Sequence, residues 1–348
     1  MNGCNDRSTC GNRGDATFIV FAIFLVFSLL FAALGFFARD IISFVVIKGD
    51  YFKKEKVLRE VSAQVIALIA RDNKPDSDSK FDDMWGRISL LETENLKISV
   101  RDASSLINPN FAFENLLVTM NVFAPGTNYA KFHELRTVTG PVTGFSSSFG
   151  ETFSEEALEK FLSPWSYCNV NLANETMVFR YYAQRTGKKV EDQPFFAAFR
   201  EKRRNNVFIS EKSLATMLGQ DYIDVFPVLF AKPQYNINYI DEKILANILH
   251  QTSRDYTLKL PEDLAEQLVV QRSSGALTAN DLVSLIKPKF KGTILEHYFG
   301  AVTWFWEIRV KQNSLELVTI AARVPVDPQT AGANNKEFFR IVKEEFNR

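Results

Sequence analysis

The stretch ATFIVFAIFLVFSLLFAALGFFA, residues 16 to 38, decides the fold of this chain, because its 23 residues include no charged side chain. An α-helix rises about 1.5 Å per residue, so the stretch is about 35 Å long as a helix and can cross a hydrocarbon core of roughly 30 Å. Lipid offers no hydrogen-bond partners, which forces the backbone of such a segment to pair within the helix. The sequence therefore predicts a membrane-spanning helix near the N-terminus.

A short polar leader precedes this apolar stretch. Arg7 and Arg13 lie in the leader, and basic residues favour the cytoplasmic side, so we expect the bulk of the chain to lie on the opposite side. An ordinary secretory signal has a shorter apolar core, followed by a small-residue cleavage site. Here the polar part ends at Gly14 and Asp15, and the apolar residues follow at once.

The helical pattern continues beyond the apolar stretch. Val57, Val61, Val65 and Leu68 recur at helical spacing, with Arg59 and Glu60 between them and three lysines just before them. This pattern is typical of a helix with one face to bury. We predict one long helix over residues 15–72, with its membrane part over 16–38, and Gly49 as a candidate break.

Two separate regions show the alternation of half-buried strands. Near the middle of the chain, Leu96, Ile98 and Val100 alternate with polar residues. Near the C-terminus, apolar and aromatic residues alternate over 302–310 and again over 315–321, with a turn at Gln312-Asn313-Ser314 between them. This second region is predicted to form a β-hairpin.

The two strand regions are separated by about two hundred residues of mostly helical pattern. The predicted fold class is therefore α+β, with the long helix packed on a small antiparallel sheet that a large helical insertion interrupts. The predicted segments are a leader over 1–14, the long helix, a sheet domain over 73–102 and 297–325, the insertion over 103–296, and a C-terminal tail or helix over 326–348.

The insertion contains an internal repeat. RNNVFISEKSLATML at 204–218 aligns without gaps with RSSGALTANDLVSLI at 272–286, and each copy follows an Asn-x-Asn tripeptide, at 169–171 and 236–238. We predict two related helical units, over about 169–218 and 236–286. Ser210 and Thr278 are expected to cap the last helix of each unit. A third tripeptide, Asn108-Pro109-Asn110, begins the insertion.

The leader and the order of these motifs resemble protein K, a minor pseudopilin family of the bacterial type II secretion system. The resemblance covers nearly the whole chain: the leader ending in Gly14, Asp102 before the first Asn-x-Asn, the second Asn-x-Asn before a Leu-rich helix at 235–249, and Tyr298-Phe299 in an aromatic strand. Most pilins have Glu at the fifth mature position, where this chain has Ile19, and protein K also lacks that Glu. Asp15 as the first mature residue and Tyr239-Ile240 depart from the family pattern.

The resemblance implies a function and a location. Prepilin peptidase would cut between Gly14 and Asp15, and methylation of the new N-terminus would follow. The protein would be a single-pass protein of the bacterial inner membrane, with its bulk in the periplasm. It would act at the tip of the pseudopilus, in complex with other minor pseudopilins, in protein export across the outer membrane.

Two other functions stay open at this point. The chain could be a minor pilin of a type IV pilus or a DNA-uptake machine, which the sequence hardly separates from the first function. It could also be a membrane-anchored periplasmic binding protein or hydrolase. That function predicts a cleft with converging polar residues and an uncut leader.

The sequence offers few groups for chemistry of its own. Of the three cysteines only Cys168 follows the leader, so a disulfide within the mature chain is excluded, and the three histidines have no metal-site spacing. Two Ser-x-x-Lys patterns, at 77–80 and 284–287, are short enough to occur by chance. No enzymatic activity and no catalytic residue are predicted.

Two segments of the sequence bear on calcium and nucleic acid as ligands. Asp102, Asn108 and Asn110 could present oxygens to calcium from one loop, and calcium occurs in some members of the resembled family. These three residues are the candidate metal ligands, and no cofactor is otherwise predicted. The basic run 200–204 contains Glu201 and fits a solvated helix face, and the net charge is zero, so no nucleic acid is expected.

Overall fold

The computed structural model describes residues 12–71, 76–140, 142, 144–145, 149–164, 168–225, 229–286, 290–324 and 338–347. By its internal contacts the chain divides into two units, Met1–Val57 and Leu58–Arg348. Helix α1 (Asn12–Ala70) supplies the described part of the first unit and begins the second. The helix is continuous through Gly49, so the break that the sequence suggested at this residue does not occur. A single glycine costs a helix about 1 kcal/mol, which a helix of this length tolerates.

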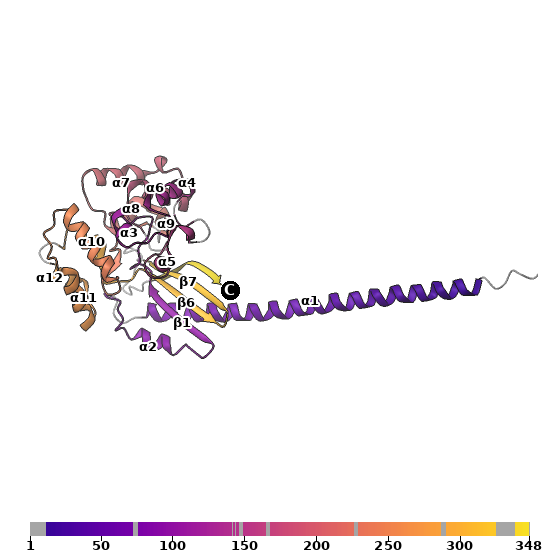
Figure 1. Ribbon diagram of the computed structural model, residues 1–348. Helices are drawn as coiled ribbons and strands as arrows, with labels where there is room; N and C mark the ends of the chain where they lie inside the picture. Colours follow the sequence, from indigo (N-terminus) through magenta and orange to yellow (C-terminus); the bar gives the residue numbers. More distant parts are fainter. Residues whose placement is uncertain are drawn as a thin grey trace, which may run out of the picture. The chain divides into compact units, whose positions relative to one another are not determined.

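The second unit contains a four-stranded antiparallel sheet (Figure 1). Its strand order is β1 (Leu96–Asp102), β6 (Phe305–Gln312), β7 (Leu315–Val324) and β8 (Phe338–Asn347). The predicted hairpin is confirmed: Gln312 pairs with Leu315 across a turn in which Asn313 has φ 56°. Asparagine tolerates this left-handed conformation better than most residues.

The prediction of a tail or helix over 326–348 was wrong for its last part. Residues 338–347 form strand β8, which pairs antiparallel with β7 from Val324↔Phe338 to Glu316↔Asn347, with an irregularity at Ile320/Ala321. The segment FFRIVKEEFN contains Lys, Glu and Arg, which favour helices locally. The open edge of β7 offers a complete row of backbone partners, and this tertiary pairing overrides the local preference.

The C-terminal part of α1 packs on the sheet. Leu58 and Val65 are fully buried, and Ile69 is 1% exposed. The Ser62 hydroxyl donates to Thr319 Oγ1 of β7 at 2.9 Å. These contacts confirm that a helix packs on a small antiparallel sheet.

Short elements make up most of the remaining chain. The helices of at least four residues are α2 (Met84–Ser89), α3 (Glu114–Thr119), α4 (Tyr129–Thr139), α5 (Glu155–Lys160), α6 (Glu175–Thr186), α7 (Pro194–Arg204), α8 (Glu211–Leu218), α9 (Tyr222–Val225), α10 (Glu242–Asp255), α11 (Leu264–Ser274), α12 (Ala279–Leu285) and α13 (Leu295–Tyr298). Two parallel strand pairs join them: β2 (Cys168–Asn169) with β3 (Leu229–Phe230), and β4 (Tyr235–Asn236) with β5 (Phe299–Gly300).

The insertion leaves and rejoins the sheet at one end. It follows the last residue of β1, Asp102, which pairs with Trp306 at the start of β6. This end lies opposite the β6–β7 turn. Both faces of the aromatic strand are covered there, since the neighbouring side chains of Phe305 and Trp306 point to opposite faces and are 1% and 0% exposed. Phe230 of the insertion packs against Trp304 with 4.9 Å between the ring centroids.

Candidate functional site

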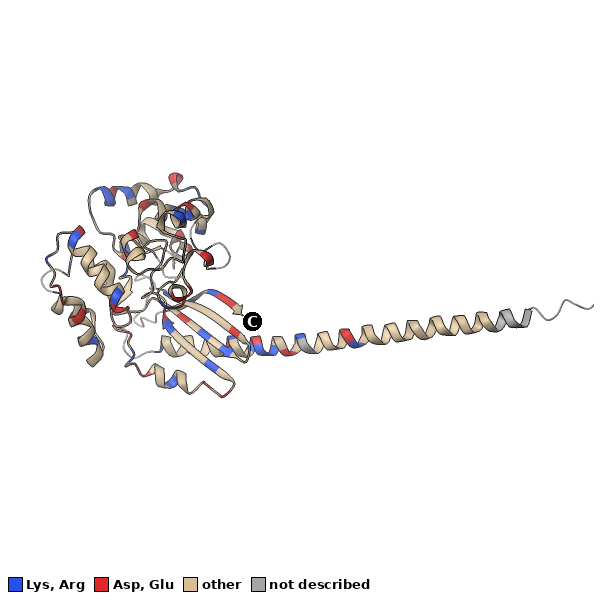
Figure 2. Cartoon of the chain, in the orientation of Figure 1, with Lys and Arg blue, Asp and Glu red and all other residues tan. Residues whose placement is uncertain are grey.

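The N-terminal part of α1 presents a continuous apolar surface. Large apolar side chains between Phe18 and Val46 are exposed to between 47% (Ile41) and 74% (Phe18). Within the described residues, this helix is long and apolar enough to cross a membrane, and none of its most apolar 18-residue window is buried. Figure 2 shows this half of α1 mostly in tan. The charged residues between Phe18 and Val46 are Arg39 and Asp40.

Charged residues return after this apolar surface. Lys48 lies over the rings of Phe44 and Phe52, with its Nζ atom 5.6 and 5.7 Å from their centroids. Long basic side chains commonly cover apolar surface in this way and keep their charged end in water. The apolar surface therefore ends near Lys48.

The predicted processing positions lie in the first turn of α1. Gly14 and Asp15 have helical backbone, while residues 1–11 of the predicted leader lie outside the described residues. Ile19, where most pilins would have Glu, is 57% exposed on the same helix. Cleavage at Gly14 stays a prediction.

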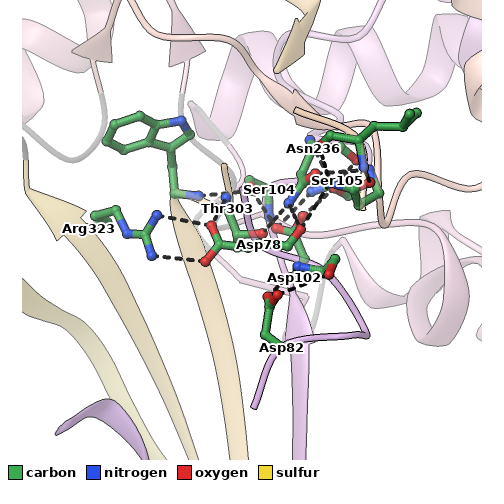
Figure 3. A network of polar contacts seen from close by, with 12 residues as sticks. Asp78, Asp82, Asp102, Ser104, Ser105, Asn236, Thr303 and Arg323 are labelled. Carbon is green, nitrogen blue, oxygen red and sulfur yellow. Dashed lines mark hydrogen bonds and ion pairs between the residues drawn. The ribbon is translucent and has the colours of Figure 1, made fainter. Parts of the chain in front are cut away.

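Asp102 is the centre of a buried polar network at the junction of sheet and insertion (Figure 3). Its Oδ1 atom accepts from the Ser104 backbone N–H at 2.8 Å and from the Ser104 hydroxyl, and its Oδ2 atom accepts from the Ser105 hydroxyl. The Ser105 hydroxyl also lies 3.2 Å from the backbone O and N of Asn236, in the Asn-x-Asn at 236–238. Asp102 therefore fixes the start of the insertion to a segment 134 residues further along, from position 102 to position 236.

A buried ion pair completes this network. Both Nη atoms of Arg323 donate to the carboxylate of Asp78 at 3.0 Å, and the Asp78 and Arg323 side chains are only 1% and 3% exposed. Asp78 Oδ2 also accepts from the Thr303 backbone N–H at 2.6 Å, while Asn236 Nδ2 donates to the Asp78 backbone O at 2.9 Å. The network thus joins the segment after α1, strand β7 and the insertion.

Burial dominates the electrostatics of both acids. It raises the pKa of Asp102 to about 6, against the lowering effect of the Ser104 and Ser105 hydroxyls. It raises the pKa of Asp78 to about 7, although Arg323 favours the charged form. Two carboxylates with raised pKa values can mark a functional site, but Asp78 is fully buried and Asp102 is only 5% exposed, so neither is open to a ligand in this structure.

The three Asn-x-Asn tripeptides share one set of hydrogen bonds. In each, the first side chain accepts from the second backbone N–H, at 2.9, 2.8 and 2.9 Å. The second side chain then bonds both backbone groups of one distant residue. The pairs are Asn110 with Val142, Asn171 with Ile209, and Asn238 with Leu277, all at 2.7–2.9 Å. The asparagine amide therefore acts as a substitute for one residue of a β-ladder.

An arginine stabilises each of the three turns. Arg136 donates to the backbone O of Pro109 and Asn110, Arg203 to those of Asn171 and Ala173, and Arg272 to those of Ile237 and Ile240. Arg203 belongs to the basic run at 200–204, so part of that run is half-buried structure and not only a solvated face.

The insertion therefore contains three related helical units, one more than predicted. We call them the asparagine units, and they begin at the tripeptides 108–110, 169–171 and 236–238. Each of the three has one parallel β pairing: Ile107 with Leu162, Cys168 with Leu229, and Tyr235 with Phe299. The sequence held a signal for the extra unit. Val142-Thr143, six residues after Arg136, matches Ile209-Ser210, six residues after Arg203. The predicted caps are confirmed, since Ser210 accepts from the Ser213 N–H and Thr278 forms a capping box with Asp281.

The candidate calcium ligands have other partners in this structure. The carboxylate of Asp102 accepts from the two serines, Asn108 Oδ1 accepts from the Asn110 N–H, and Asn110 Oδ1 accepts from the Val142 N–H. Across the described residues, no group of three or more His, Cys, Asp or Glu side chains is placed to hold a metal ion. These three side chains therefore fit a polar junction that is held together by hydrogen bonds within the protein. Calcium binding stays a prediction.

The candidate catalytic groups that the structure describes lie in different surroundings. Ser77 is buried, Ser284 is exposed on α12, and Lys287 lies outside the described residues. His297 packs on Phe208 with 4.4 Å between ring centroids, and burial lowers its pKa. Cys168 starts strand β2, and its side chain lies outside what the structure describes.

The comparisons with known proteins add no family to these observations. No protein-family model matches the chain, and no curated protein matches it in sequence.

Proposed function

We propose that this protein is a membrane-anchored minor subunit of the pilin class, a minor pseudopilin of a type II secretion system. One observation carries the proposal: a single long helix has an exposed apolar N-terminal part, and its C-terminal part packs on a small antiparallel sheet. A helix of this kind can be held in lipid and then transferred into a bundle of similar helices. A purely soluble function gives no reason to expose this apolar surface.

The place of the insertion supports a position at the filament tip. Within the second unit, Arg59 of α1 contacts Glu344 and Phe346 near the β6–β7 turn, whereas the insertion covers the other end of the sheet. A bulky domain at that end would collide with a further subunit stacked above it. Ile19 in place of the usual Glu agrees with such a terminal subunit.

Cleavage of the N-terminal leader tests whether the protein is a subunit of the pilin class. The full chain is expressed in cells that contain a prepilin peptidase, and the intact mass of the membrane-extracted protein is measured. We expect a chain that begins at Asp15 with a methylated amine. Gly14→Leu should block the cut, while the matched leader variant Gly11→Leu should be processed normally.

An uncut chain beginning at Met1, in cells that process a known prepilin, would contradict the proposal and support a permanently anchored binding protein. Deletion of the gene then separates the two filament functions. We expect loss of secreted proteins from the medium, with surface pili and DNA uptake unchanged.

A further inference from the structure

A cavity of about 620 Å³ lies between the first two asparagine units of the insertion. Arg136 of α4, Arg180 of α6 and Arg203 of α7 line it, and we call it the arginine cavity. Among the described lining residues there is no Asp or Glu. Three permanent positive charges therefore share one concave surface without an acidic counter-charge in its wall.

Two of these arginines also have a structural role. Arg136 uses its Nη1 atom for the carbonyls of the first turn, and no bond joins its Nε or Nη2 to another described residue. Arg203 uses both Nη atoms for the second turn. A guanidinium has five N–H donors, so Arg136 and Arg203 keep donors beyond those that hold the turns.

Arg180 differs from both, because none of its N–H groups holds a described turn in place. It is exposed on α6, and it makes no hydrogen bond or ion pair with any described residue. The nearest acid along the helix, Glu175, does not line the cavity and is paired with Arg200 at 2.6 Å. Arg180 is therefore free to bind a ligand that enters the cavity.

Apolar and aromatic side chains share the rest of the wall with polar ones such as Asn174 and Thr176. Phe111, Phe113, Tyr129 and Met177 contribute to it, together with the exposed His133. Arginine side chains bind carboxylate and phosphate through paired N–H donors, and an apolar wall suits the carbon body of a small molecule. We propose that the arginine cavity binds an organic anion with two or more carboxylate or phosphate groups, and that Arg180 is its main charged contact.

Binding to the detergent-solubilised full chain tests this inference. Sodium citrate and inorganic phosphate are titrated separately by calorimetry, at constant ionic strength kept with NaCl. We expect saturable binding of at least one anion. Arg180→Ala should weaken it about tenfold, which is typical of one lost charge-assisted hydrogen bond. Arg180→Lys should restore part of the loss.

Arg204→Ala is the matched control, because Arg204 is exposed on α7 next to Arg203 but does not line the cavity. This variant should bind as the wild type does. Stronger binding of citrate would identify polycarboxylates as the ligand class, and stronger binding of phosphate would identify phosphorylated ligands. The inference fails if neither anion saturates the protein, or if Arg180→Ala binds both as tightly as Arg204→Ala does.

Discussion

At the residue scale, the pair of Asp78 and Arg323 determines how the segment after α1 is held to strand β7. Removing two charges from water costs several kcal/mol for each ion, and good geometry with further hydrogen bonds is needed to offset that cost. The two 3.0 Å bonds and the Thr303 N–H offset part of the cost here, since burial still raises the pKa of Asp78 to about 7. Such a pair contributes more to specifying which segments pack together than to the net free energy of unfolding.

Breaking this pair on one side should destabilise the fold strongly. Asp78→Asn removes the carboxylate to which both Nη atoms of the buried Arg323 donate, and we expect a loss of about 3–5 kcal/mol in the free energy of unfolding. Denaturant titration of the chain measures this change. The double variant Asp78→Asn/Arg323→Met should lose less than the sum of the single variants, because no uncompensated charge remains.

Arg254→Ala, which removes an exposed ion pair with Asp255, serves as the control and should change stability by less than about 1 kcal/mol. Equal effects of Arg254→Ala and Asp78→Asn would show that the buried pair has no special role.

Asp102 should make stability depend on pH. Its pKa is raised from 3.8 to about 6 in the folded chain, so folding favours its protonated form. The associated stability is complete below about pH 4 and is lost as the pH rises through 6, a change of about 3 kcal/mol. The raised pKa of Asp78 acts in the same direction up to about pH 7.

Glu307 acts in the opposite direction, because Arg101 and Arg309 lower its pKa below 4.5 and outweigh its burial. Between pH 5 and 7 burial also raises the pKa of Glu211 and lowers that of His297, which act on stability in opposite directions, so the comparison with a variant is what isolates Asp102. Unfolding measured across this window should show falling stability for the wild type and a clearly flatter profile for Asp102→Asn. Identical profiles for the two proteins would rule out a titrating Asp102.

At the element scale, the asparagine units show how a chain with short helices builds a defined insertion. Each unit closes a loop of 30 to 40 residues with one amide side chain, one arginine and one parallel β pairing. Helices of this length are marginal alone in water. The polar closure and the buried apolar residues of each unit supply the order that helix propensity does not.

Asn171→Ala should therefore destabilise the second unit. The change leaves the N–H and C=O of Ile209 without their side-chain partner, and Ile209 is fully buried. Two unmade hydrogen bonds at a buried residue should cost about 2–4 kcal/mol. Hydrogen exchange should locate the loss of protection in α7 and α8.

Asn115→Ala gives the comparison, since Asn115 is exposed and donates only a long bond of 3.4 Å to Gln251. It should leave both stability and exchange almost unchanged. If Asn171→Ala were as stable as Asn115→Ala, the amide would not close the unit.

At the scale of the whole molecule, the chain contains two units with different requirements for solvent. The described part of the first unit is a helix with exposed apolar residues, and the second has a buried core on both sides of its sheet. A fragment of residues 48–348 should be monomeric without detergent. The full chain should require detergent or lipid.

Size-exclusion chromatography and circular dichroism check this expectation. The fragment should keep the near-ultraviolet spectrum of the detergent-solubilised full chain, because Trp85 and Trp306 pack within the second unit with 5.9 Å between their ring centroids. A full chain that stays monomeric in plain buffer would contradict the role assigned to the apolar surface.

The sequence by itself determined the features that depend on neighbouring residues. The long helix follows from an uninterrupted apolar stretch and helical periodicity, the β6–β7 hairpin from alternation around Asn313, and the helix caps from Ser210 and Thr278. Only the tertiary structure decided the rest. Strand β8 exists because β7 offers an edge that outweighs the helical preference of its residues, and Asp78 meets Arg323 because chain segments 245 positions apart are packed together. Long-range pairing depends on how the whole backbone folds. The residues next to one partner do not specify which distant segment it will contact.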